Sequence, residues 1–216
     1  MGLFVSSFLL AYAGLFPIVN PVGSAPIFLG LTHRSSEKEG ATLARRVAIN
    51  SFLLLVGSLF LGSHVLVFFG ISLPVLRIGG GLVVAAFGWK LLNSSETSTN
   101  GGEAKNMPST APDSFYPLTM PLTVGPGSIS VAVALGSQRP KATDLAHLAL
   151  LGAGAVTGIL AIAVTVYLSY RFAERLVRLL GSNGTNVVLR LSAFILLCIG
   201  IQIVWGGLSE LPLPRR

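Results

Sequence analysis

The sequence is poor in charged residues. Asp, Glu, Lys and Arg make up 11% of its 216 residues, whereas hydrophobic residues make up 52%. A soluble domain carries about 25% charged residues to cover its surface. The mean hydropathy of +0.76 shows that apolar side chains take their place. These values exclude a soluble enzyme, a disordered chain, a coiled coil and a collagen-like fibre.

Cysteine and acidic residues are also scarce. The one cysteine, Cys198, excludes an internal disulfide and a multi-cysteine metal site. The 8 Asp and Glu residues fall in predicted loops or at helix ends, so no intramembrane carboxylate is expected for proton transfer. We also find no zinc-protease motif, phosphate-binding loop or Ser-His-Asp arrangement in the apolar stretches. The sequence therefore predicts that the chain is not an enzyme and has no catalytic residue, metal or cofactor.

Long stretches without charge predict helices that cross a membrane. A bilayer core of about 30 Å needs about 20 apolar residues per helix. The charge-free stretches are residues 1–33, 47–76, 78–89, 114–138, 145–170 and 191–209. The third is short, but it becomes long enough when extended to residues 73–92, with Arg77 and Lys90 reaching the interface from its ends. We predict an all-α polytopic protein with six transmembrane helices in the lipid bilayer.

A polar segment divides these helices into two groups of three. Residues 93–113 are rich in Ser, Thr, Asn, Gly and Pro and read as a flexible linker between residues 1–92 and residues 114–210. Because each half has an odd number of spans, the second half must start on the opposite side of the membrane. The sequence therefore predicts one membrane domain built from two inverted-topology repeats, an architecture found in many secondary transporters.

The basic residues predict an orientation. Loops on the cytoplasmic side of a membrane protein carry an excess of Lys and Arg. With both termini outside, ten basic residues lie inside: Arg34, Lys38, Arg45, Arg46, Lys90, Lys105, Arg171, Arg175, Arg178 and Arg190. The five outside are Arg77, Arg139, Lys141, Arg215 and Arg216. We predict both termini on the outer side, and the net charge of +7 then calls for no nucleic-acid partner.

The first and fourth predicted helices each contain a cluster of helix breakers. A shift of 104 residues places Pro17 on Pro121, Gly23 on Gly127 and Ser24 on Ser128. Proline removes a backbone donor and glycine loosens the helix, so breaks are predicted at residues 20–23 and 123–127. In lipid, the freed backbone groups must be satisfied by protein, water or a ligand.

Each break predicts part of a solute-binding site. The half-helices that follow would present free amides and a positive dipole end to a carboxylate. Asn20 and Thr123 could bind an ammonium group or cap the half-helices. The predicted binding residues are Asn20, Pro21, Gly23, Ser24, Thr123, Gly125, Gly127 and Ser128.

Three further polar residues lie within predicted spans. His64 is titratable, but its place near a helix end favours an interfacial residue without a function. Asn50 and Gln202 favour hydrogen bonds between helices over ligand binding, since a buried amide needs a partner.

The two breaks also carry a family resemblance. Residues 16–23, FPIVNPVG, and residues 121–127, PLTVGPG, resemble the first-helix and fourth-helix signatures of the MarC family of integral membrane proteins. The resemblance implies a multi-pass protein of a prokaryotic inner membrane. Because some members are described as transporters of neutral amino acids, it also implies a solute such as glycine or alanine.

These observations favour a secondary transporter with alternating access between the two breaks. A pore-forming channel and a non-transporting membrane enzyme or assembly subunit are the alternatives. The coupling ion, proton or sodium, stays open, and the sequence is compatible with a homo-oligomer.

Overall fold

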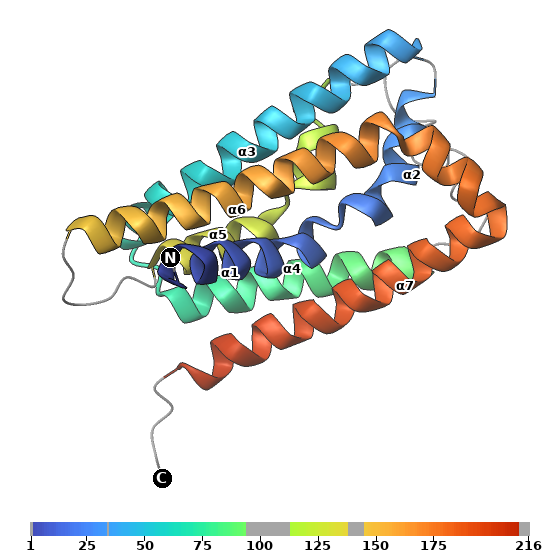
Figure 1. The fold of residues 1–216 in the computed structure, drawn as a ribbon. Coiled ribbons are helices and arrows are strands. Elements are labelled where there is room, and N and C mark those ends of the chain that lie inside the picture. The colour runs from blue at the N-terminus through green and yellow to red at the C-terminus, as the bar shows by residue number, and fades with distance from the viewer. Residues whose placement is uncertain (1, 34, 94–112, 138–144, 212–216) are drawn as a thin grey trace.

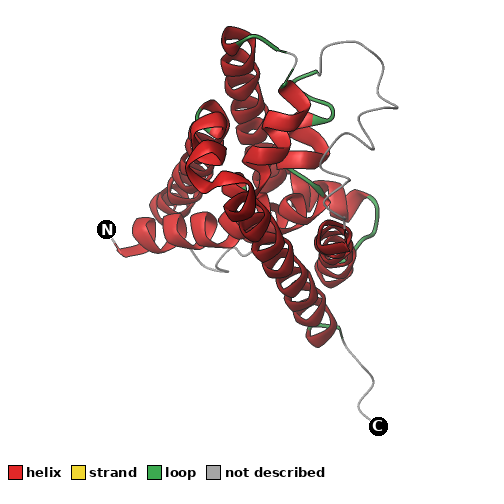
Figure 2. Ribbon diagram, turned by 90° about the vertical axis from the view of Figure 1, so that its right-hand side faces the viewer, coloured by secondary structure: helices red, strands yellow, loops and turns green. Residues whose placement is uncertain are grey.

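The computed structural model describes residues 2–33, 35–93, 113–137 and 145–211. The predicted linker, residues 93–113, lies outside the described residues except at its two ends. The described residues fold into helices, with no strand among them (Figure 2). In order they are α1 (Gly2–Val19), α2 (Pro21–Thr32), α3 (Glu37–Phe68), α4 (Leu73–Asn93), the π-helix η3 (Leu118–Thr123), α5 (Pro126–Ser137), α6 (Leu145–Arg171) and α7 (Ala173–Ser209).

Five helical segments are long and apolar enough to cross a membrane. They are α1, α3, α4, α6 and residues 183–209 of α7. The third predicted span, residues 73–92, coincides with α4. The fourth predicted span, residues 114–138, is not one continuous helix: it contains η3 and the 12-residue α5. A multi-pass, all-α membrane protein is therefore confirmed in the described residues, and five of the six predicted spans have the required length.

The helices run alternately between two ends of the bundle (Figure 1). α1 begins at the end where α3 finishes and α4 begins, and α2 ends at the opposite end, near the start of α3. α7 changes direction at Gly181, whose φ of 66° is a left-handed conformation that glycine adopts without strain.

Glycines let two pairs of helices, α4 with α7 and α1 with α6, lie close together. A Cβ at Gly81 or Gly88 of α4 would lie within 3 Å of backbone atoms of α7. A Cβ at Gly154 or Gly158 of α6 would lie as close to carbonyl oxygens of α1. Small residues let membrane helices approach backbone to backbone, where dispersion replaces the hydrophobic effect as the attraction. The absence of side chains at these positions therefore sets the spacing of the bundle.

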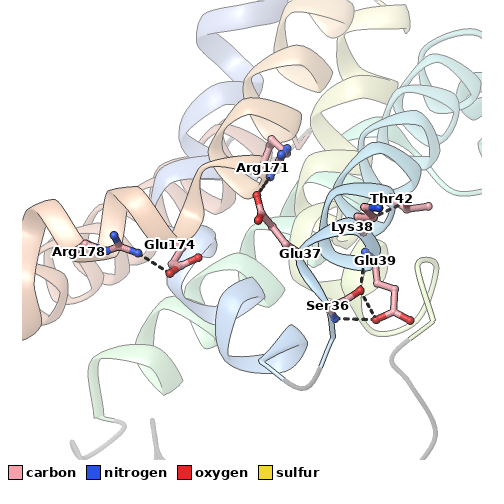
Figure 3. A network of polar contacts seen from close by, with 8 residues as sticks. All are labelled: Ser36, Glu37, Lys38, Glu39, Thr42, Arg171, Glu174 and Arg178. Atoms are coloured by element: carbon pink, nitrogen blue, oxygen red, sulfur yellow. Dashed lines mark hydrogen bonds and ion pairs between the residues drawn. The ribbon is translucent and has the colours of Figure 1, made fainter.

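Polar contacts gather at the end where α2 leads into α3 and α6 leads into α7 (Figure 3). Ser36 and Glu39 form a reciprocal capping box that satisfies two amides at the start of α3. Arg171 at the end of α6 pairs with Glu37 at 3.4 Å, which ties the two helices together. At the other end, Arg77 of α4 pairs with Glu210 after α7. The charged residues that form these ion pairs thus lie at or near helix ends.

Candidate functional site

The first break is a single residue. Asn20 separates α1 from α2 in a left-handed conformation, with φ of 46° and ψ of 59°. Asparagine adopts this conformation more readily than most residues. Its side-chain Oδ1 accepts a hydrogen bond from the amide of Gly23 at 3.2 Å and so caps α2. The predicted break at residues 20–23 is confirmed, and Pro21, fully buried, is the first residue of the new helix.

The second break is longer and irregular. η3 ends at Thr123, Val124 is extended, and α5 starts at Pro126. Ser128 donates from Oγ to the carbonyl of Gly125 at 2.9 Å, and the amide of Ile129 donates to the same carbonyl at 3.1 Å. The break predicted at residues 123–127 is therefore confirmed, although it is built differently from the first.

One side chain that the sequence did not single out connects the two breaks. The hydroxyl of Tyr170, near the end of α6, lies 2.8 Å from Oγ1 of Thr123 and also interacts with the hydroxyl of Ser24. Thr123 donates its own proton to the carbonyl of Leu118 at 2.7 Å, so Tyr170 is the donor to Thr123. Ser24 of α2 is a further polar neighbour of the Tyr170 hydroxyl. Tyr170 of α6 thus bonds to η3 and lies beside Ser24 of α2.

Tyr170 is itself held in place by an aromatic stack. Its ring lies against that of Phe28 of α2, with centroids 4.4 Å apart and planes 15° from parallel. Both side chains are buried. The stack fixes the hydroxyl between the two breaks and closes the space between α2 and α6.

The glycine that follows each break lies against a different helix. A Cβ at Gly23 would meet the side chain of Asn20 and, at 2.7 Å, Oγ of Ser192 in α7. A Cβ at Gly127 would collide with Val84 of α4. Gly127 was predicted to let a ligand approach, but in the structure it also lets α5 approach α4.

The eight predicted residues therefore form two groups. Asn20, Pro21, Gly23, Ser24 and Thr123 surround Tyr170 or the start of α2. Gly125, Gly127 and Ser128 lie at the start of α5, where Gly127 faces α4. The structure brings Ser24 and Thr123 together through Tyr170 and does not join the second group to them by a direct side-chain hydrogen bond among the described residues.

The groups at these breaks are hydroxyls, amides and carbonyls. No cluster of three or more His, Cys, Asp or Glu occurs among the described residues. Such groups can bind a neutral or zwitterionic solute through hydrogen bonds and helix dipoles.

A family model described as "MarC family integral membrane protein" matches residues 5–211. The chain belongs to the MarC family. It is 32% identical over 203 residues to the UPF0056 inner membrane protein MarC of Escherichia coli O1:K1, a match that covers 91% of both chains. It is 31% identical over the same length to the protein of that name from E. coli K12. No solved structure matches the chain.

The family membership places this MarC family chain in a membrane, and its relatives are named as inner membrane proteins. Their names state no solute and no enzymatic activity.

Two cavities flank α5 in this MarC family chain. One, of about 490 Å³, lies between α1, α3, α5 and α6 and is lined by Ser7, Leu135 and Gly152 among others. The other, of about 240 Å³, lies between α4, α5 and α7, with Arg77 and Leu135 in its wall. None of the eight predicted residues lines either cavity. These two cavities lie beside the C-terminal half of α5, away from the predicted residues.

The other polar residues have distinct surroundings. Asn50 donates to Oγ1 of Thr119 at 3.4 Å, which is the contact between elements that the sequence favoured. His64 and Gln202 are exposed on the surface of the bundle. Ser51 is fully buried and its hydroxyl has no partner among the described residues. Gln202 was predicted to make a hydrogen bond between helices, and it makes none among the described residues of this chain.

Sequence reasoning missed Tyr170, Phe28 and Ser192. Tyr170 lies at the end of a predicted span, where an aromatic residue usually marks the membrane interface. Its role depends on a contact with Thr123, 47 residues away. No local pattern indicates such a contact.

Proposed function

We propose that this MarC family chain is a secondary transporter of small neutral amino acids such as glycine and alanine, with its site between the two helix breaks. The observation that carries the proposal is the position of Tyr170, whose hydroxyl bonds to Thr123 at the second break and has Ser24, beside the first break, as a polar neighbour. A transporter needs such a link, because solute bound between two halves must bias how they move relative to each other.

The packing supports the inverted-repeat part of the proposal. Gly23 rests on α7, the last helix of the second half, and its counterpart Gly127 rests on α4, the last helix of the first half. α4 and α7 themselves run antiparallel, since Gly81 faces Gly200 and Gly88 faces Leu197. In each half, the glycine after the break thus packs against the last helix of the other half. This arrangement is expected when the two halves are related by a two-fold axis in the membrane plane. The broken span α1–α2 would then correspond to the broken span η3–α5.

The backbone donors favour one placement of the solute. At the first break, Asn20 already binds the amide of Gly23. At the second break, the amides of Gly127 and Ser128 have no partner among the described residues. A solute carboxylate can therefore accept hydrogen bonds from more free amides at the start of α5 than at the start of α2. Its ammonium group would be received by Asn20, Thr123 or nearby carbonyl oxygens.

The positions of the two cavities support one side of the membrane as the side from which the solute reaches the proposed site. Both lie beside α5 towards the end where α1 begins, whereas the Phe28–Tyr170 stack closes the α2 side. If both termini are on the outer side of the inner membrane, as the basic residues indicate, the structure corresponds to a state that opens outwards.

The test is a thermal-shift screen of the twenty amino acids on purified protein, repeated with sodium and at two pH values. A solute that binds the folded state raises the melting temperature. Glycine or alanine should do so at concentrations near their Kd. A panel in which no amino acid raises the melting temperature contradicts the proposed substrate class, and single-channel current in liposomes contradicts a carrier.

The Tyr170→Phe variant tests the site itself. It keeps the ring stack on Phe28 and removes the hydroxyl that links Ser24 and Thr123, so affinity should fall about fivefold, the loss of one hydrogen bond. Tyr167→Phe, one turn earlier on α6, is the matched control, since its hydroxyl has no partner among the described residues. If Tyr170→Phe and Tyr167→Phe bound the amino acid with equal affinity, the solute site would lie elsewhere.

A further inference from the structure

The exposed face of α7 carries a regular stripe. Six exposed residues follow one another at spacings of four and three: Leu191, Ile195, Cys198, Gln202, Trp205 and Ser209. This 3.5-residue period is that of a coiled-coil seam, in which each side chain of the stripe packs between side chains of a facing helix. The opposite face of α7 is already packed against α4 through Gly200 and Gly207. The stripe therefore points away from the rest of the chain.

Gln202 is the polar residue at the centre of this stripe. Its side chain is exposed and has no hydrogen-bond partner among the described residues. It lies seven residues before the end of α7, a depth of about 10 Å at 1.5 Å per residue. At that depth an amide is in the hydrocarbon region, where it has no water to bond to. Other hydroxyls in these helices, such as those of Ser58 and Thr165, bond to the carbonyl four residues earlier. The Gln202 side chain makes no such bond among the described residues.

A second copy of the chain can supply the hydrogen-bond partner that the Gln202 side chain lacks. Copies of a membrane protein insert in the same orientation, so two α7 helices related by a two-fold axis along the membrane normal run parallel. Each residue near the axis then faces its own counterpart. An amide is both donor and acceptor, so two Gln202 side chains can bond to each other in both directions. A foreign helix would need a polar residue of its own at the same depth.

We propose that the chain forms a homodimer through the Leu191–Ser209 stripe of α7, with the two Gln202 side chains hydrogen-bonded across the axis. A polar residue at one position of such a seam fixes its register and the number of helices. The dimer does not depend on the transport function proposed above, because the stripe contains none of the residues proposed to bind the solute.

The single native cysteine gives a direct test. Cys198 lies in the stripe, one turn before Gln202, so the proposal places two copies of Cys198 close to the dimer axis. Oxidative cross-linking in liposomes at low protein density should give a disulfide-linked dimer of this chain. Cys198→Ser should abolish it. The matched control moves the cysteine to α3 as Cys198→Ser with Leu53→Cys, another exposed position outside the stripe, which should cross-link poorly.

Gln202→Leu tests the role of the amide. It should lower cross-linking at Cys198 about fivefold or more at the same protein density. Native mass spectrometry from detergent should show a matching loss of dimer, while the exposed position leaves the monomer folded. A cross-link yield equal to that of the α3 control would overturn the proposal, as would a dimer unaffected by Gln202→Leu.

Discussion

The two helix breaks begin from similar sequences and end in different structures. At the first, one residue changes conformation: Asn20 turns left-handed and caps α2 with its own side chain. At the second, the chain from Leu118 to Pro126 passes through a π-helix and an extended residue, and Tyr170 and α4 hold it from outside. The first break is fixed by residues next to one another in the sequence, and the second by residues far away. The second is therefore more sensitive to how the helices are packed.

The half-helix after the first break, α2, is also more tightly surrounded than the half-helix after the second break, α5. α2 is closed in by the Phe28–Tyr170 stack, whereas α5 has a cavity on each side. Empty space beside a helix leaves it room to shift, because its side chains have fewer neighbours to hold them. We infer that α5 moves more readily than α2 when the solute site opens.

Gly127→Ala should have the largest effect on the second break. The added methyl group collides with Val84 in α4, so we expect the free energy of unfolding to fall by about 2–3 kcal/mol. Thermal denaturation of the purified protein in detergent measures this. Gly30→Ala in α2, where a Cβ would meet nothing within 4 Å, is the matched control.

The same collision can be relieved from the other side. Val84→Ala removes the methyl group that Gly127→Ala would strike, so the double variant should be more stable than the sum of the two single changes predicts. Simple additivity would show that α5 does not rest on α4 at this point.

The sequence was sufficient for the positions of the breaks and insufficient for their contacts. Proline and glycine act on their immediate neighbours, so residues 20–23 and 123–127 could be identified without a structure. Gly127 was interpreted as space for a ligand because nothing in the sequence placed Val84 beside it. Tyr170 could not be found, since its partners come from two other elements. Gln202 was expected to bond to another helix, but a sequence does not show which face of a helix is covered or by what.

Asn20→Ala and Asn20→Gly test whether the first break is fixed locally. Alanine loses the cap to Gly23, worth about 1 kcal/mol, and must hold a left-handed backbone at a further cost of about 1 kcal/mol. Glycine adopts that backbone freely and should cost only a few tenths of a kcal/mol. Denaturation midpoints should therefore rank wild type, Asn20→Gly and then Asn20→Ala. If the two variants were equally stable, the break would be held by packing, as the second one is.

The smallest effect is expected from one substitution made at equivalent positions, Ser24→Ala and Ser128→Ala. Ser128 donates to a Gly125 carbonyl that also accepts from Ile129, so its loss leaves that carbonyl bonded and should cost about 0.5 kcal/mol. Ser24 is buried beside the Tyr170 hydroxyl, and its loss should cost about 1 kcal/mol.

Solute affinity separates the same two variants further. Ser128→Ala keeps the backbone amide proposed to receive the carboxylate, so binding should hardly change. Ser24→Ala removes the polar neighbour of Tyr170 at the first break, so solute binding should weaken together with stability. The opposite ranking would mean that the side chain at the start of α5, and not its backbone, contacts the solute. The two half-helices would then bind it in the same way despite their different breaks.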